Sequence, residues 1–217
     1  MSVRLFVFDL DGTLVDSLRD LANSVSALLA QCGARPLTED EVAAMVGEGA
    51  STLVARAFEA VRLTPPADAL ARFLAIYDTR LLDCTRAYEG MPAVLEALGA
   101  RASLAVLTNK PRAATVRILN GLKLGQFFAD DAIIGGDGPL GRKPDPAGLA
   151  QLCARAGVGA AETVMVGDSA VDWRTARAFG TRICLARYGF GFREFPRAEL
   201  RGDEILLDRP SDLIAIP

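Results

Sequence analysis

The chain has 217 residues, of which 51% are hydrophobic and 24% are charged, and its formal net charge is -3. This composition excludes a disordered chain, and the length suits a core domain that carries an insertion. The acidic balance argues against a nucleic-acid-binding or anionic-membrane surface, and the absence of histidine rules out a histidine base or nucleophile.

The cysteines and the N-terminal residues bear on the compartment. The four cysteines are far apart with no CxxC spacing, which predicts buried free thiols rather than a disulfide framework or a zinc site. The first residues run directly into an apolar segment without the pattern of a signal peptide, and no apolar run approaches about 18 residues. We therefore expect a cytoplasmic monomer or homodimer that binds neither membranes nor nucleic acids.

The first predicted element is a buried strand around residues 6–8 that ends in Asp9-Leu10-Asp11-Gly12. Because side chains of a strand alternate between its faces, Asp9 and Asp11 would share one small volume. Like charges so close require a cation or hydrogen-bond donors, and Mg2+ prefers oxygen ligands and often bridges a carboxylate to a phosphate. The alternative is an ordinary solvated Asp-Gly turn after a strand.

The pattern of residues 16–84 predicts only helices. Apolar spacing gives the first, a Thr38-x-x-Glu41 capping box begins the second, and Pro65-Pro66 separates the last two. The predicted helices are residues 17–33, 38–47, 50–63 and 67–82. A helical block directly after a strand and its turn indicates an inserted cap, so we predict a helical cap at 16–84 and a core formed by 1–15 and 85–217.

Helices and strands alternate from residue 91 onward. The predicted helices are residues 91–100, 111–122, 146–156 and 170–179, and the predicted strands are 103–108, 132–134, 163–167, 182–186 and 204–207. Strands separated by helices imply right-handed crossovers and a parallel sheet covered on both faces. The predicted fold class is α/β, a Rossmann-like parallel-sheet core with a small all-helical cap inserted after the first strand. Ligands are expected at the carboxyl ends of the strands.

Further polar side chains follow the predicted strands. Thr108 and Asn109 precede a helix whose free N–H groups could bind an anion, or they are helix caps. Lys143 lies in a turn kept extended by the next proline and would balance carboxylates and phosphate, or it is a surface lysine. Asp168 and Asp172 lie at the start of a helix and could face the same strand end, or they serve as caps.

These motifs together resemble the haloacid dehalogenase superfamily. The matching features are Asp-x-Asp-x-Thr at 9–13, a strand-end threonine at 108, a lysine before proline at 143, and Gly-Asp-Ser-x-x-Asp at 167–172. Their order and approximate spacing agree over the whole chain, with the helical insertion where subclass I of that superfamily has its cap.

The resemblance implies phosphoryl transfer through an aspartyl-phosphate, with Asp9 as the nucleophile and Asp11 as the acid and base. The Mg2+ ligands would be Asp9, the Asp11 carbonyl and Asp168, with Asp172 orienting metal-bound waters or Lys143. The groups that hold the phosphoryl oxygens would be Thr108, Lys143 and main-chain amides near Leu10, Asp11 and Asn109.

Missing residues separate the branches of the superfamily. The acid at Asp11 favours phosphate chemistry over dehalogenation, residues 14–90 lack the lysine that phosphonoacetaldehyde hydrolases need, and the hexose phosphomutases use a cap histidine. The segments 46–57 and 188–191 resemble those of phosphoglycolate phosphatases. Gly47 would then approach the site and Arg56 is a candidate partner for a substrate carboxylate, whereas Glu48 would repel an anionic substrate if it pointed inward.

The expected function is Mg2+-dependent hydrolysis of a small phosphorylated metabolite, with 2-phosphoglycolate as the leading candidate. Pyrophosphate, a sugar phosphate or a nucleotide remains an alternative substrate. A non-catalytic binding module on the same fold is the alternative of a different class, because a fold alone does not establish function.

Overall fold

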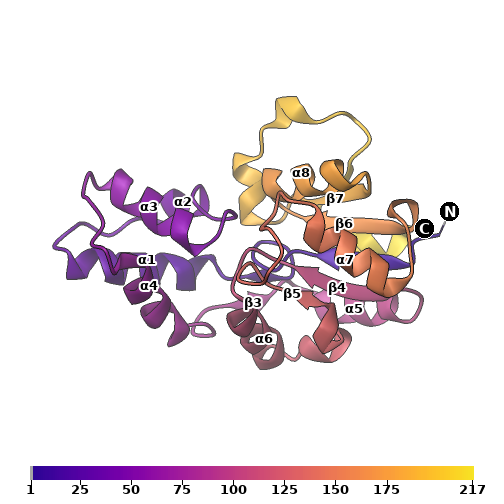
Figure 1. The fold of residues 1–217 in the computed structure, drawn as a ribbon, viewed down its shortest axis with the longest axis horizontal. Helices are drawn as coiled ribbons and strands as arrows, with labels where there is room; N and C mark the ends of the chain where they lie inside the picture. Colours follow the sequence, from indigo (N-terminus) through magenta and orange to yellow (C-terminus); the bar gives the residue numbers. More distant parts are fainter. Residues whose placement is uncertain (1) are drawn as a thin grey trace.

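A computed structural model describes residues 2–217 and places a lobe of four helices, called the cap below, beside a larger core domain built on one sheet (Figure 1). The two chain ends lie close together on the side of the core away from the cap, where the Val3 N–H donates to the Pro217 carbonyl. None of the helices within residues 2–217 combines the length and apolar character that a membrane span requires.

The core sheet has six strands in the order β5-β4-β1-β6-β7-β8, and every neighbouring pair is parallel. The strands are β1 (Leu5–Phe8), β4 (Ser103–Leu107), β5 (Ile133–Ile134), β6 (Thr163–Gly167), β7 (Arg182–Ala186) and β8 (Ile205–Leu207). β1 is central, and its last residue Phe8 pairs with Val106 of β4 and Val166 of β6. The predicted α/β fold class is confirmed.

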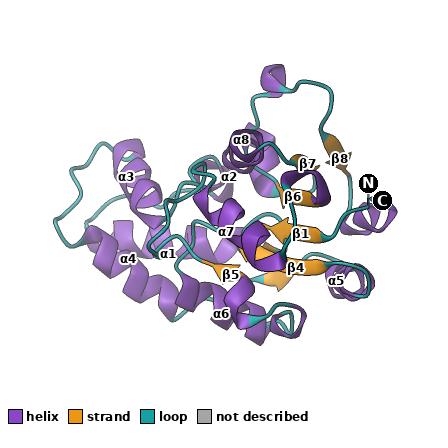
Figure 2. Cartoon of the chain, turned by 45° about the vertical axis from the view of Figure 1, so that its right-hand side comes forward, coloured by secondary structure: helices purple, strands orange, loops and turns teal. Residues whose placement is uncertain are grey.

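Alternation along β1 divides the core into two apolar layers. Phe6 and Phe8 pack on the face covered by α5 and α6, whereas Leu5 and Val7 pack on the face covered by α7 and α8. These helices are α5 (Met91–Gly99), α6 (Arg112–Gly121), α7 (Ala147–Ala156) and α8 (Ala170–Phe179), and Figure 2 shows them around the strands. Every residue of β1 is buried, as a strand covered on both faces requires.

The cap consists of α1 (Leu18–Gln31), α2 (Glu39–Ala43), α3 (Ala50–Ala60) and α4 (Ala69–Asp78). The apolar stripe of α1 buries Leu21, Val25 and Leu28, and α4 packs against this helix. The predicted capping box at the start of α2 is confirmed, because the Glu41 N–H donates to Thr38 Oγ1 while the Thr38 N–H donates to Glu41 Oε2.

Two local features differ from the sequence prediction. β2 (Val15–Asp16) and β3 (Arg86–Ala87) form a two-stranded antiparallel ribbon where the chain leaves the core and returns to it. Strands of two residues have no periodicity to detect, so the sequence pattern did not predict them. Pro111 precedes α6 as its N-cap rather than occupying the first helical position, and its N-cap carbonyl accepts from Thr115.

The sequence analysis also missed Asp20, which ties the cap to the returning strand. Its carboxylate is fully buried and accepts hydrogen bonds from the Cys84 N–H, the Thr85 N–H and Thr85 Oγ1 at 2.7 to 3.0 Å. A charge buried among main-chain donors fixes the position of segment 84–85, which leads into β3.

Removal of this carboxylate tests its structural role. We expect Asp20→Ala to lower the free energy of unfolding by about 3 kcal/mol, because buried N–H groups would lose their acceptor. Urea denaturation followed by circular dichroism measures the change. The exposed neighbour Asp83 is the control, and Asp83→Ala should shift the free energy by no more than about 0.5 kcal/mol. Equal effects of the two substitutions would contradict the assigned role.

Candidate active site

Three strands deliver one polar side chain each to the same edge of the sheet. Asp9 follows β1, Thr108 follows β4 and Asp168 follows β6, each as the first residue after its strand. The carboxyl ends of parallel strands meet at one edge of the sheet, so these residues come together although they lie far apart in the sequence. All three are buried and line one cavity, so the structure brings these predicted strand-end residues together.

Lys143 lies buried between two carboxylates of this edge. Its Nζ is 2.7 Å from Oδ1 of Asp9 and 2.6 Å from Oδ1 of Asp172. Burial opposes the charge, but the carboxylates of Asp172 and Asp9 outweigh it and raise the pKa of Lys143 above its ordinary value. The lysine is therefore a fixed ammonium beside Asp9, and the alternative of a surface lysine is wrong.

Asp172 has a second role at the start of α8. Its Oδ2 accepts from the Ser169 N–H and from Ser169 Oγ, so the residue caps the helix while its Oδ1 holds Lys143. A Cβ at Gly167 would lie 2.3 Å from Asp172 Cβ, so a side chain there would displace this carboxylate. Both carboxylate oxygens of Asp172 already have partners, which favours a positioning role.

Carboxylate oxygens of Asp9, Asp168 and Asp172 lie within 4.8 Å of one another, and all three residues are buried. Burial raises the pKa of Asp9 to about 7 despite Lys143, and burial together with Asp172 and Asp9 raises the pKa of Asp168 well above its usual range. Three buried carboxylates against one ammonium leave an excess of negative charge. This donor set of hard oxygens fits a divalent cation such as Mg2+.

The glycine-containing loop 188–191 packs closely around Asp168. The sequence analysis did not place this loop in the site. The Gly191 N–H donates to Asp168 Oδ2 at 2.7 Å. A Cβ at Gly12, at Gly189 or at Gly191 would lie within 2.8 Å of an Asp168 side-chain atom, and Gly12 also has a φ of +84°. The glycine-rich stretch after β7 was the available signal, since it allows backbone to approach the carboxylate closely.

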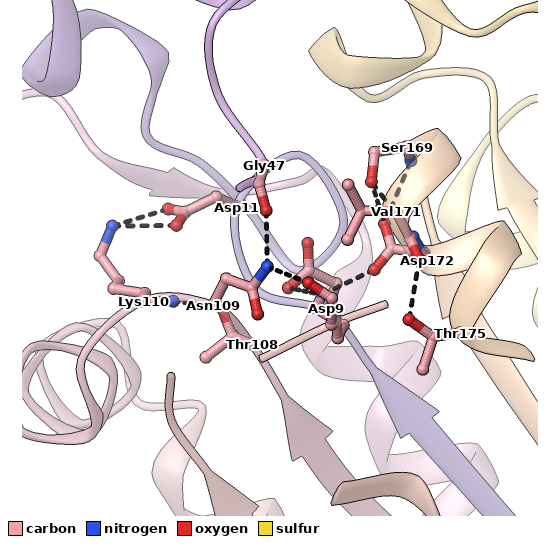
Figure 3. A network of polar contacts seen from close by, with 11 residues as sticks. Asp9, Asp11, Gly47, Thr108, Asn109, Lys110, Ser169, Val171, Asp172 and Thr175 are labelled. Atoms are coloured by element: carbon pink, nitrogen blue, oxygen red, sulfur yellow. Dashed lines mark hydrogen bonds and ion pairs between the residues drawn. The ribbon is translucent and has the colours of Figure 1, made fainter. Parts of the chain in front are cut away.

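Asp11 is turned away from the acidic cluster. Lys110 Nζ lies 3.0 and 2.9 Å from its two carboxylate oxygens (Figure 3). Ser17 Oγ also donates to Asp11 Oδ1. Lys110 is itself buried, and its Nζ is 4.5 Å from the ring centroid of Tyr77 in the cap. Sequence reasoning missed Lys110, although its place directly after the strand-end Thr108-Asn109 pair was a signal.

Free main-chain donors line the same edge. Within residues 2–217 the N–H groups of Leu10, Asp11 and Asn109 donate no hydrogen bond, whereas Asp9 donates to the Val166 carbonyl. Such N–H groups beside buried carboxylates need an acceptor, and an anion could supply it. Their position agrees with the predicted phosphoryl-binding amides.

The cap meets this edge through Gly47. The Asn109 amide donates to the Gly47 carbonyl at 2.9 Å and to the Lys143 carbonyl at 3.0 Å (Figure 3). Arg56, in contrast, is ion-paired to Glu48 at 2.6 Å and also donates to the Met45 carbonyl. Glu48 is thus neutralised by Arg56, and the repulsion expected from it does not arise in this arrangement.

A cavity of about 290 Å³ lies between the cap and the sheet edge. Its polar end includes Asp9, Asp11, Thr108, Asn109 and Lys110, and Arg56 is not among the residues that line it. Its remaining walls are largely apolar and come mainly from the cap and α6. These walls include Leu21, Leu53, Phe73, Leu74, Ala113 and Ala114.

Comparison with known proteins relates this site to a family. Residues 6–186 match the family described as haloacid dehalogenase-like hydrolase. The phosphoglycolate phosphatase of Rhodospirillum rubrum is 45% identical over 85% of this chain and 79% of its own length. A plasmid-encoded phosphoglycolate phosphatase of Cupriavidus necator is 37% identical over 97% and 91%. A crystal structure of a predicted phosphoglycolate phosphatase from Haemophilus somnus superposes with a TM-score of 0.89, at 30% identity and 99% and 97% coverage.

The acidic cluster generates a test of metal binding. We expect saturating Mg2+ to raise the melting temperature of the wild-type protein by about 5 to 10 °C, because the cation neutralises carboxylates that only the folded state brings together. Asp168→Asn should lose most of this increase, whereas the exposed control Asp83→Asn should retain it. Differential scanning calorimetry in chelator and in Mg2+ measures the shift. An equal increase in Asp168→Asn would contradict the assignment.

Proposed function

The chain belongs to the haloacid dehalogenase-like hydrolases, and from that membership we propose that it hydrolyses 2-phosphoglycolate in a Mg2+-dependent reaction. It is a phosphoric monoester hydrolase, as are the relatives that bear the name phosphoglycolate phosphatase. The observation that carries the proposal is Asp9, which lines the cavity with the Lys143 ammonium 2.7 Å from its Oδ1.

Asp9 is the nucleophile in this proposal. One of its carboxylate oxygens attacks the phosphorus, the bond to the leaving alkoxide breaks, and water then hydrolyses the aspartyl-phosphate to return the carboxylate and release phosphate. Lys143 limits the build-up of negative charge as the phosphate dianion approaches Asp9, and Asp172 positions that ammonium.

Asp11 supplies the proton transfers. It protonates the leaving oxygen in the first step and takes a proton from the attacking water in the second. In the present arrangement its carboxylate is held by Lys110 and Ser17, so its side chain has to turn before it can reach the substrate.

Asp9 and Asp168 would hold the Mg2+, together with the main-chain carbonyl of Asp11. When bound, the cation neutralises charge on the phosphoryl oxygens and lowers the repulsion between substrate and carboxylates. The phosphoryl oxygens would accept from the free N–H groups of Leu10, Asp11 and Asn109, and from Thr108 Oγ1. Support for this cradle comes from the unused donors at the strand ends.

Residues 16–84 are proposed to act as the cap domain that covers the bound substrate, with Gly47 in contact with Asn109 of the core. Cytoplasmic placement remains our prediction and is supported by four cysteines that are all free. The state as monomer or homodimer also remains a prediction.

Replacement of the nucleophile tests the mechanism. We expect Asp9→Asn to lower phosphate release from 2-phosphoglycolate by more than about 10³-fold, because an amide cannot form the phosphoenzyme. Phosphate release in Mg2+ is the measurement, and circular dichroism verifies that the variant is folded. Retained turnover in folded Asp9→Asn would contradict the role of Asp9.

The substrate assignment has its own test. Wild-type enzyme is assayed with 2-phosphoglycolate, pyrophosphate, sugar phosphates and nucleotides, in Mg2+ and then in chelator. The highest kcat/KM is expected for 2-phosphoglycolate, with loss of activity in chelator. A preference for another ester would replace the substrate while keeping the chemistry, and no Mg2+-dependent hydrolysis of any ester would favour the non-catalytic alternative.

A further inference from the structure

We propose that Lys110 and Tyr77 form the subsite for the substrate carboxylate, and that a carboxylate bound there takes the Lys110 ammonium from Asp11 and frees Asp11 to turn toward the leaving group. This inference rests on the proposed function, because it concerns a small phosphorylated carboxylic acid in the same cavity. Lys110 would then both select an acidic substrate and release Asp11, the residue that protonates the leaving oxygen.

The charges around the cavity point to Lys110. Within residues 2–217 it is the only lysine or arginine that lines the cavity, whereas four aspartates line it. Three of these, Asp9, Asp11 and Asp168, belong to the reaction centre, and the fourth, Asp78, is paired with Arg117. Among the described charged side chains that line the cavity, only Lys110 would therefore attract a second negative group on the substrate.

Lys110 can exchange the carboxylate of Asp11 for the carboxylate of a substrate. An ammonium has three N–H donors, and the two oxygens of Asp11 lie 3.0 and 2.9 Å from Nζ. A substrate carboxylate offers the same charge and the same pair of acceptors, so it competes with Asp11 for the same donors. After the exchange Asp11 retains only the hydrogen bond from Ser17.

Tyr77 completes the subsite from the cap side. Lys110 Nζ lies over the Tyr77 ring, 4.5 Å from the ring centroid. Tyr77 is 4% exposed and lines the cavity. Its hydroxyl is buried and has no hydrogen-bond partner within residues 2–217. Burial raises the pKa of Tyr77 to about 12, so the hydroxyl stays protonated and remains a donor. A bound carboxylate would supply the acceptor that this hydroxyl lacks.

The apolar walls of the cavity strengthen the preference for an acidic substrate over a neutral one. Leu53 and Phe73 of the cap line the same cavity and offer no hydrogen bond. In such surroundings an ion pair is stronger than in water. The apolar walls offer no hydrogen bond to an unpaired Lys110 or to a neutral group of the substrate. The structure thereby favours Lys110 over Arg56, which is engaged by Glu48 outside the cavity.

A neutral isostere of the substrate separates binding of the carboxylate from the rest of the reaction. The probes are 2-phosphoglycolate and 2-phosphoglycolamide, in which an uncharged amide replaces the carboxylate. The acid preference is the ratio of kcat/KM for the acid to that for the amide. Lys110→Gln should lower this ratio by about 10- to 100-fold, the range that loss of a charge-assisted hydrogen bond corresponds to.

The exchange with Asp11 predicts an asymmetric effect on the two substrates. Lys110→Gln should lower kcat/KM for the acid much more than kcat/KM for the amide, since the amide cannot draw Lys110 from Asp11 in the wild-type enzyme. An equal fall for both substrates would show a merely structural role of Lys110 and overturn the proposal. Lys110→Arg keeps a cation and should restore the acid preference to within about threefold of wild type.

Further variants keep the proposal testable if Lys110→Gln does not fold. Tyr77→Phe retains the ring and removes only the hydroxyl, and it should lower the acid preference about 3- to 10-fold. An unchanged preference in this variant would remove Tyr77 from the subsite and contradict the proposal. Lys123→Gln, at an exposed lysine, is the matched control and should leave the ratio unchanged. Loss of the preference in Arg56→Gln, with the preference kept in Tyr77→Phe, would assign the carboxylate to Arg56 instead.

Binding to the inactive Asp9→Asn variant gives a readout independent of turnover. In calorimetric titrations, the acid should bind about 10- to 100-fold more weakly to the double variant Asp9→Asn/Lys110→Gln than to Asp9→Asn alone. The amide should bind equally to the two proteins. Failure of the proposed function looks different: wild-type enzyme would then hydrolyse other esters but not 2-phosphoglycolate. Hydrolysis of 2-phosphoglycolate with the same acid preference in Lys110→Gln would overturn this inference alone.

Discussion

The buried contact of Lys143 with Asp9 and Asp172 is the interaction on which the rest of the site depends. An ammonium buried at this sheet edge is stable only because carboxylates surround it, and it offsets part of the charge of these carboxylates, as a bound cation would also do. The parallel sheet makes this possible, since strands from distant parts of the chain end side by side. Glycines at 12, 167 and 189 then let backbone and carboxylates approach within contact distance.

The cap extends this charge arrangement into a closed cavity. Its polar contacts with the core include the Asn109 amide on the Gly47 carbonyl, Lys110 over the ring of Tyr77, and the ion pairs of Arg193 with Asp40 and of Arg117 with Asp78. Exposed ion pairs contribute little stability, so these pairs would not prevent the opening and closing proposed for the cap. Asp20 and the ribbon of β2 and β3 fix the two connections at which that motion would occur.

Lys110 connects substrate selection with this cap and core arrangement. It follows a core strand, touches a cap aromatic ring and holds the side chain of Asp11, so one ammonium links three parts of the machinery. Among the described residues that line the cavity, Lys110 is the one lysine or arginine, so the proposed selection of an acidic substrate depends on its location. The proposed function therefore assigns chemistry to Asp9 and specificity to Lys110, at neighbouring strand ends.

The sequence alone determined the α/β class and the order of the longer helices and strands, and it put forward Asp9, Thr108, Lys143, Asp168 and Asp172 as candidate site residues, because apolar periodicity locates strands and polar motifs lie in the loops that follow them. The tertiary structure decided what periodicity cannot encode. The sequence placed Asp11 beside Asp9 by strand alternation, but the turn begins there and Lys110 draws the carboxylate aside. Arg56 appeared to be the cation for a carboxylate until its pairing with Glu48 was known. Asp20, Lys110 and the loop donor Gly191 take their roles from contacts between residues far apart in the chain, so their positions in the sequence could at most draw attention to them.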